Sequence, residues 1–220
     1  DGSDRRRLTS TSWNEESPSW SPDGRRILYT STRGGRFQAW AMNADGSDQR
    51  ALTDTSSHEL ASDWSPDGTR IVFYSSRHDR NPGSCWPRCT WQLYVMSADG
   101  SNQRRLVSSS GSDQAPRWSP DGSRLVFWSI RGSNWDISTV DPDGSGERRL
   151  TSTPEWEALP AWSPDGSQIA YCSMTSATMS NRGIGIMNAD GTGIRTLIPG
   201  GGHVNEDPAW APDGTRILFQ

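Results

Sequence analysis

Short apolar runs bounded by polar turn residues recur along the whole chain. Five of them share one setting, because each closely follows a Pro-Asp-Gly sequence. They are Arg26–Tyr29, Ile71–Tyr74, Leu125–Trp128, Ile169–Tyr171 and Ile217–Phe219. Each run is apolar on both faces, which is typical of a strand in a sheet that lies between two neighbouring sheets. A second set, such as 38–42 and 92–96, leads into the next Asp-Gly pair. The pattern predicts an all-β chain of several stacked sheets.

Asp-Gly pairs punctuate these runs, beginning at positions 1, 23, 45, 67, 99, 121, 143, 165, 190 and 213. Asp-Gly is a strong signal for a tight hairpin turn, because Gly accepts a positive φ and the Asp side chain bonds to nearby backbone. The pairs alternate between a Trp-Ser-Pro-Asp-Gly setting, as at 20–24, and a Met-Asn-Ala-Asp-Gly setting, as at 42–46. The double period of about 44 residues indicates a repeat protein.

Each repeat predicts four antiparallel strands, A to D, with tight turns between A and B and between C and D. Short strands at even spacing with one Trp motif per unit are typical of a β-propeller. We expect one domain over 1–220, in which 1–10 form strand D of a closing blade. Full blades then span 11–54, 55–108, 109–152 and 153–198, and 199–220 form a partial blade. About five blades are visible, as a ring with one atypical blade or as a fragment of a six-bladed ring.

The composition limits the classes of protein that this chain can belong to. Only 31% of the residues are hydrophobic and the mean hydropathy is −0.78, values that favour disorder. A net charge of only −4 and twelve Trp oppose disorder, because buried Trp side chains can replace a Leu-rich core. The mildly acidic balance argues against nucleic-acid binding. No apolar stretch approaches 18 residues, so no membrane span is expected.

The order of motifs within the repeat carries a resemblance to a known family. Pro-x-Trp-Ser-Pro-Asp-Gly is followed by an apolar run, by Met-Asn-Ala-Asp-Gly-Ser and by Arg-x-Leu-Thr. This order resembles the repeat of the TolB-type (WD40-like, PD40) propeller family over essentially the whole chain. The resemblance implies the propeller fold. Because the family's namesake looks like a periplasmic adaptor that binds a lipoprotein, it also implies a bacterial, extracytoplasmic (periplasmic or secreted) module that binds a protein or peptide.

The lengths of the connections differ between the two faces of the predicted propeller. The A–B and C–D turns share one face, here called the turn face, and the B–C and D–A connections share the other, the loop face. One Asp-Gly gap is 32 residues and another is 25, where most are 22. The extra residues fall in B–C loops, within 77–90 and 173–183. Because binding residues concentrate in variable loops on a rigid scaffold, the loop face is the predicted binding face.

The loop face also collects the unusual side chains of the sequence. The candidate binding residues are Trp13, Glu15, His58, Glu59, Asp113, Trp156, Glu157, His203 and Glu206 at the channel mouth, and His78, Trp86 and Arg88 in the insertion. Four acids and Asn205 lie eight residues before the Asp of each A–B turn, near the entry to strand A. They could form a ring that attracts a cation or a basic partner loop. Alternatively, they satisfy backbone N–H groups of a neighbouring blade or pair with an Arg such as Arg117.

Two of the three cysteines predict a disulfide and therefore an oxidising environment. Cys85 and Cys89 lie in the insertion of blade two, where a disulfide would staple an exposed loop. A zinc site with His78 is an alternative, but a fourth ligand and standard spacing are missing. Cys172 follows an apolar run and is expected to be a buried free thiol.

The sequence lacks a nucleophile elbow, an HExxH motif, a P-loop and a dinucleotide fingerprint. We therefore expect a non-catalytic, monomeric binding module without a cofactor. The alternative is a metal-dependent polysaccharide lyase or hydrolase, because propellers similar to oligogalacturonate lyase hold a metal with histidines at the channel mouth. His58 and His203, with Glu59 or Glu206, would be its ligands. A sensor domain of a larger receptor or kinase is a third hypothesis.

Overall fold

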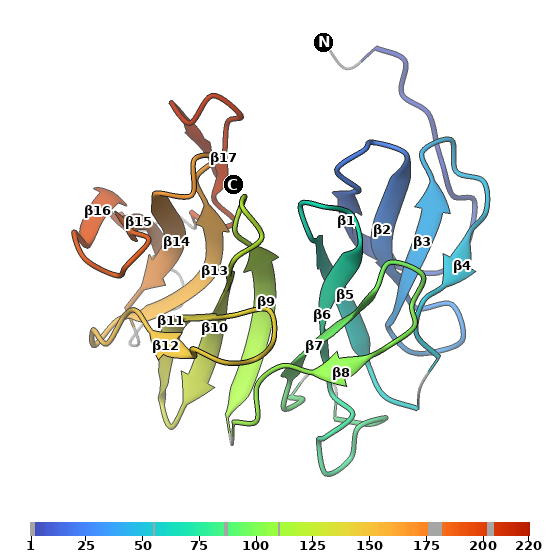
Figure 1. The fold of residues 1–220 in the computed structure, drawn as a ribbon, viewed down its shortest axis with the longest axis horizontal. Helices are drawn as coiled ribbons and strands as arrows, with labels where there is room; N and C mark the ends of the chain where they lie inside the picture. Colours follow the sequence, from blue (N-terminus) through green and yellow to red (C-terminus); the bar gives the residue numbers. More distant parts are fainter. Residues whose placement is uncertain (1–2, 55, 86–87, 110, 176–181, 202–204) are drawn as a thin grey trace.

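The computed structural model describes residues 3–54, 56–85, 88–109, 111–175, 182–201 and 205–220, and these residues contain β-strands but no helix. Within them, no helix is present that could cross a membrane. Four antiparallel sheets of four strands and one sheet of two strands follow one another along the chain. This arrangement confirms the all-β propeller fold, with four full blades and the first two strands of a fifth (Figure 1).

The strands of each blade pair in chain order. Blade one contains β1 (Glu15–Trp20), β2 (Arg26–Ser31), β3 (Gln38–Asn43) and β4 (Arg50–Ala51). Blade two contains β5 (Glu59–Trp64), β6 (Arg70–Ser75), β7 (Gln92–Ser97) and β8 (Arg104–Arg105). Blade three contains β9 (Ser112–Trp118), β10 (Leu125–Arg131), β11 (Asn134–Val140) and β12 (Arg148–Arg149). Blade four contains β13 (Trp156–Trp162), β14 (Gln168–Met174), β15 (Arg182–Asn188) and β16 (Arg195–Ile198). The partial blade contains β17 (Ala209–Trp210) and β18 (Ile217–Leu218).

The first strands of successive blades are neighbours, so they form the inner wall of the propeller. Contacts join β1 to β5, β5 to β9, β9 to β13 and β13 to β17. The fourth strands lie outside, and in Figure 1 β4 and β16 occupy opposite flanks of the molecule. Strand B lies between two neighbouring blades, because Phe73 of β6 packs with blade one and Val72 of β6 packs with blade three, which explains why this strand is apolar on both faces.

The Asp-Gly pairs form the tight turns that their sequence predicts. In every described pair the Gly has a positive φ, between 67° and 94°. In the A–B turns the hydroxyl of a Ser donates to the Asp, as from Ser21 Oγ to Asp23 Oδ1 at 2.6 Å. The same contact recurs from Ser65 to Asp67 and from Ser119 to Asp121. Hydrogen bonds to the charged form lower the pKa of Asp67 and of Asp121 to about 2. These Asp residues therefore hold turns together.

At each blade junction, the Gly of a C–D turn lies in close contact with the backbone of a Leu that precedes its blade. A Cβ atom added to Gly100 would lie 2.7 Å from the carbonyl oxygen of Leu52, at the end of the preceding blade. The equivalent contacts join Gly144 to Leu106, Gly191 to Leu150 and Gly46 to Leu8. Residues 3–10 are not a strand in the structure, because they have no strand C to pair with. Leu8 nevertheless takes the place against blade one that Leu52 takes against blade two, and closure of a ring through 1–10 stays a prediction.

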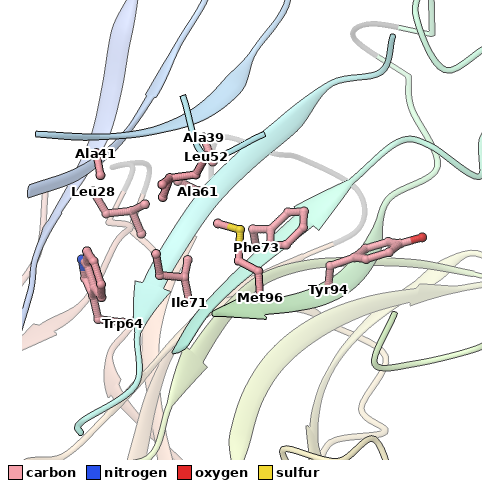
Figure 2. Packing of buried hydrophobic residues seen from close by; sticks show 10 residues of the cluster. All are labelled: Leu28, Ala39, Ala41, Leu52, Ala61, Trp64, Ile71, Phe73, Tyr94 and Met96. Atoms are coloured by element: carbon pink, nitrogen blue, oxygen red, sulfur yellow. The ribbon is translucent and has the colours of Figure 1, made fainter. Parts of the chain in front are cut away.

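The core consists of layers between blades rather than one central cluster. Trp64 of β5 packs with Leu28 and Ala41 of blade one, as Figure 2 shows, and is only 4% exposed. Trp118 of β9 packs in the same way against blade two and is 5% exposed. Trp20 holds the same motif position in blade one but is 59% exposed, because no described residues form a blade on its outer side.

Candidate functional site

The repeated acids of strand A point into their own blades. Glu59 is fully buried and accepts hydrogen bonds from Ser57 Oγ at 2.7 Å and Ser75 Oγ at 3.1 Å. Its Oε2 atom also forms an ion pair of 3.0 Å with Arg77 Nη2. Asp113 is equally buried and pairs with Arg131 Nη1 at 2.7 Å. Each of these two acids binds the Arg that stands two residues beyond its own pairing partner on strand B. Arg117 instead donates to the carbonyl oxygen of Ser62 at 2.6 Å.

Glu157 of blade four is in a different environment. Blade four has Thr175 at the position that Arg77 and Arg131 occupy in blades two and three. The Glu157 carboxylate accepts hydrogen bonds from Thr151 Oγ1, at 3.0 Å, and from Thr153 Oγ1. Burial, which outweighs the hydrogen bonds from Thr153 and Thr151, raises the pKa of Glu157 to about 7, with a smaller contribution from the nearby charges of Asp136 and Glu155. Glu157 is therefore a buried carboxyl that titrates near neutral pH.

The remaining predicted residues at the channel mouth occupy separate environments. Glu15 is partly exposed and accepts a hydrogen bond of 2.8 Å from Thr11 Oγ1. Trp13 is 47% exposed. Trp156 stacks on Trp135 of blade three, with ring centroids 4.7 Å apart. Glu206 forms an ion pair with Arg182. His203 lies outside the described residues.

The two described histidines make different contacts. His58 is buried, and its Nδ1 atom accepts a hydrogen bond of 3.4 Å from the Phe37 backbone N–H. Burial lowers the pKa of His58, which favours the neutral ring. His78 shares a hydrogen bond of 2.6 Å with the Tyr94 hydroxyl. Among the residues that the structure describes, no group of three or more His, Cys, Asp or Glu side chains could hold a metal ion.

The insertion of blade two is folded back onto the propeller. A disulfide joins Cys85 to Cys89, and Asp79 Oδ2 accepts a hydrogen bond of 2.7 Å from the Thr90 backbone N–H. Arg36 of blade one donates to the carbonyl oxygen of Gly83 at 3.3 Å. Cys89 packs beside Leu60, Trp91 and the partly buried Phe37 and Tyr74. His78 and Arg88 are exposed on this fixed loop, whereas Trp86 lies outside the described residues. Cys172 is free and buried, as expected.

A cavity of about 520 Å³ lies where the inner strands meet. It is lined by Ser17, Pro18, Asp63, Ala115, Arg117, Leu159, Pro160, Ala161, Trp162, Asp207, Pro208, Ala209 and Trp210. Four of these, Ser17, Ala115, Leu159 and Asp207, have a positive φ of 47° to 54°. Pairing with strand B is interrupted at this level in every full blade. The interrupted pairing therefore coincides with strand A residues, such as Ser17 and Leu159, that line the cavity.

The charged residues of the channel stand four residues after Glu59 and Asp113 and two residues after Asn205, their counterpart in the partial blade. Asp63 accepts hydrogen bonds from the backbone N–H groups of Trp64 and Trp118, both at 3.0 Å, and so ties blade two to blade three. Asp63, Arg117 and Asp207 are the charged residues of the cavity lining. The sequence interpretation missed Asp63 and Asp207 because it followed the acids that repeat. The sequence does contain a signal for them, because the side-chain charge at the positions of Asp63 and Asp207 within the repeat changes from blade to blade.

Fold and channel together define a β-propeller built from an Asp-Gly-rich repeat. The sequence model of the PD40 family, described as the TolB beta propeller domain, matches residues 1–83 and 88–220. The chain therefore belongs to the TolB β-propeller family, as its repeat motifs predicted.

The chain is similar to known proteins over different lengths. The chain is 36% identical over 102 residues to the Tol-Pal system protein TolB of Anaeromyxobacter dehalogenans (strain 2CP-C), a match that covers 46% of this chain and 21% of that protein. The TolB structure from Acinetobacter baumannii matches with a TM-score of 0.77 and 25% identity, over 96% of this chain and 49% of that one. The putative TolB from Agrobacterium tumefaciens matches with a TM-score of 0.71 and 21% identity, over 98% and 93%. The chain thus spans about a fifth of the first relative and about half of the second.

Enzymes also share this fold. Puromycin hydrolases and oligogalacturonate lyases match with TM-scores of 0.55 to 0.68 at 15 to 19% identity. At this level of identity the likeness shows the fold alone.

Proposed function

We propose that this propeller is a non-catalytic module outside the bacterial cytoplasm that binds a protein or peptide partner on its loop face. The folded insertion of blade two is the observation that carries the proposal. Its disulfide and its contacts with blade one reduce the cost of ordering the loop on binding. The exposed His78 and Arg88 would then meet the partner in a fixed arrangement.

Two further observations support the cellular setting and the class of function. A disulfide in an exposed loop fits an oxidising compartment such as the periplasm. The relative from Anaeromyxobacter dehalogenans is named as a Tol-Pal system protein, which fits an adaptor in the cell envelope. We expect the module to act as a monomer, with its partner bound near the channel mouth.

The experiment exchanges the insertion for the short loop of blade one. Residues 78–90 are replaced by Gly34-Gly35-Arg36, which retains Arg77, the partner of Glu59, and Trp91, part of the apolar cluster. Wild type and variant are then compared for capture of proteins from a solubilised bacterial envelope extract, identified by mass spectrometry. Arg216→Ala is the matched control, because this exposed Arg lies on the turn face. The proposal expects partners that wild type and R216A retain and the exchange variant loses. Equal capture by all three proteins would contradict it.

The metal-dependent lyase or hydrolase remains the alternative, and its support is the shared fold. Its candidate ligands His58 and Glu59 are engaged with Phe37 and Arg77, and its other His lies outside the described residues. A cation at the channel mouth is likewise a proposal. Elemental analysis of purified protein, with thermal unfolding in the presence of Mn²⁺, Zn²⁺ or Ca²⁺, distinguishes these alternatives from the binding module.

A further inference from the structure

The insertion of blade two presents two cations to solvent. Arg80 and Arg88 are exposed, and among the residues that the structure describes neither forms an ion pair. Asp79 is the one acid in the sequence 77–90. Its two carboxylate oxygens accept hydrogen bonds from the backbone N–H groups of Asn81, at 2.9 Å, and Thr90, at 2.7 Å. This single carboxylate offsets the charge of the two Arg side chains only in part.

The fold of the insertion brings these two Arg residues to one part of the loop. The hydrogen bond from Thr90 to Asp79 joins the two ends of the insertion. Arg80 is adjacent to Asp79, and Arg88 lies two residues before Thr90. The Arg88 backbone N–H also donates to the carbonyl oxygen of Cys85 at 2.7 Å, inside the ring that the disulfide closes. Both cations therefore extend from an ordered loop, so little backbone has to be ordered on binding.

Two further guanidinium groups lie beside the insertion and bond to neutral acceptors. Arg36 of blade one donates to the carbonyl oxygen of Gly83 at 3.3 Å. Arg105 of β8 donates to the Gln92 side chain and to two backbone carbonyl oxygens. Within the described ranges neither Arg pairs with a carboxylate, so both charges add to those of Arg80 and Arg88.

The two described histidines respond to this charge. Burial lowers the pKa of His58, and the charge of Arg36 lowers it more than the charge of Glu59 raises it. Burial likewise lowers the pKa of His78, and the charge of Arg105 is the next largest cause. A second positive charge is disfavoured beside an existing one, so both shifts reflect a positive potential at the insertion as well as burial.

Three other Arg side chains of the loop face are neutralised within the protein. Their ion pairs are Arg77 with Glu59, Arg131 with Asp113 and Arg182 with Glu206. From this difference we propose that the insertion binds an acidic segment of the partner protein, whose Asp or Glu carboxylates pair with Arg80 and Arg88. A guanidinium offers a planar fork of donors that matches a carboxylate, and complementary charge speeds the encounter of two proteins. This inference rests on the proposed function, because it names the chemistry of the partner on the same face.

The test measures binding of a fluorescein-labelled hexaglutamate peptide to the whole chain by fluorescence anisotropy. Hexaglutamine with the same label is the uncharged control of equal length. We expect only hexaglutamate to bind at low salt, and its affinity to fall as salt rises to about 0.15 M, because exposed charges are screened. Absent binding of hexaglutamate, or equal binding of the two peptides, would overturn the proposal. Phosphatidylglycerol vesicles are a different source of negative charge, and binding of vesicles in preference to hexaglutamate would overturn it as well.

Two double variants locate the binding on the surface. Arg80→Glu with Arg88→Glu reverses both exposed charges of the insertion and should weaken hexaglutamate binding about tenfold. Arg25→Glu with Arg216→Glu is the matched control, because it changes the net charge by the same amount at exposed Arg residues of the A–B turns, on the opposite face. We expect this control to bind hexaglutamate within about twofold of wild type. Equal weakening by the two double variants would attribute binding to net charge and overturn the proposal.

Capture from the envelope extract separates this inference from the proposed function. We expect R80E/R88E to lose the partner that R25E/R216E retains. If exchange of residues 78–90 abolishes capture but R80E/R88E keeps the partner, the proposed function stands and the acidic-segment inference fails. If the exchange variant itself keeps the partner, the proposed function fails, and this inference fails with it.

Discussion

Glu157 makes the free energy of unfolding depend on pH in a way that a single substitution can isolate. Its pKa is about 7 in the folded protein, against 4.5 as a reference for the unfolded chain. Between these values the folded state keeps a proton that the unfolded state has lost. The free energy of unfolding therefore falls as pH rises, by about 1.4 kcal/mol per unit. The contribution is fully present below pH 4.5, is lost as pH passes through 7, and amounts to about 3 kcal/mol.

Glu157→Gln removes this titration while keeping an amide oxygen that can accept from Thr151 and Thr153. We expect E157Q to be close to wild type in stability at pH 5 and more stable by up to about 3 kcal/mol at pH 8. Urea unfolding of both proteins at pH 5, 6, 7 and 8 measures the difference, in which the titration of all other groups cancels. A variant that is no more stable than wild type at pH 8 would refute the claim that this carboxyl is held neutral by burial.

Glu59→Gln is the matched control in the sister blade. Glu59 is just as buried but has Arg77 at 3.0 Å. Its loss leaves the guanidinium without its carboxylate, so E59Q should cost about 2 kcal/mol at pH 6 and at pH 8 alike. Opposite signs for E157Q and E59Q at pH 8 would attribute the difference to Arg77, which pairs with Glu59 and has Thr175 as its counterpart in blade four.

Three further predictions concern the insertion, a blade junction and metal. Replacing Cys85 and Cys89 together by Ser should cost about 2 kcal/mol, from closure of a short loop, and should raise hydrogen exchange in 78–90 while the blades stay protected. Gly100→Ala should cost at least about 2 kcal/mol in urea unfolding, because its Cβ would meet the Leu52 carbonyl oxygen at a positive φ. Gly34→Ala, where the space is open, should cost about half as much; equal costs would exclude the clash as the cause. Addition of Mn²⁺, Zn²⁺ or Ca²⁺ should leave the Tm unchanged, and a rise of several degrees would favour the lyase.

Most of the fold could be predicted from short sequence motifs. A Pro-Asp-Gly turn depends on residues adjacent in sequence, so the blades could be located from the positions of Asp23, Asp67, Asp121 and Asp165. The packing of the motif Trp could be predicted because the repeat places it identically in each blade. Trp20 departs from that expectation because its burial depends on a neighbouring blade and not on its own sequence.

The candidate site could be predicted only in part, because it depends on residues that differ between equivalent positions of the blades. The spacing of Glu59 and Asp113 placed them at the entry to strand A but could not say whether they faced the channel or their own blade. Arg77 and Arg131 decide this, and both stand two residues after the strand B residue that pairs with the acid. The same comparison of blades would have marked Glu157 as the acid without an Arg.

Hydrogen exchange of the complex determines whether the partner binds on the loop face of the propeller. Exchange is measured on the chain alone and with the partner captured from the envelope extract. We expect the partner to protect the insertion at 78–85 and the D–A connection at 56–58 and to leave exchange in the C–D turns at 44–47 and 98–101 unchanged. Protection confined to the turns, with the insertion exchanging as in the free protein, would contradict binding on the loop face.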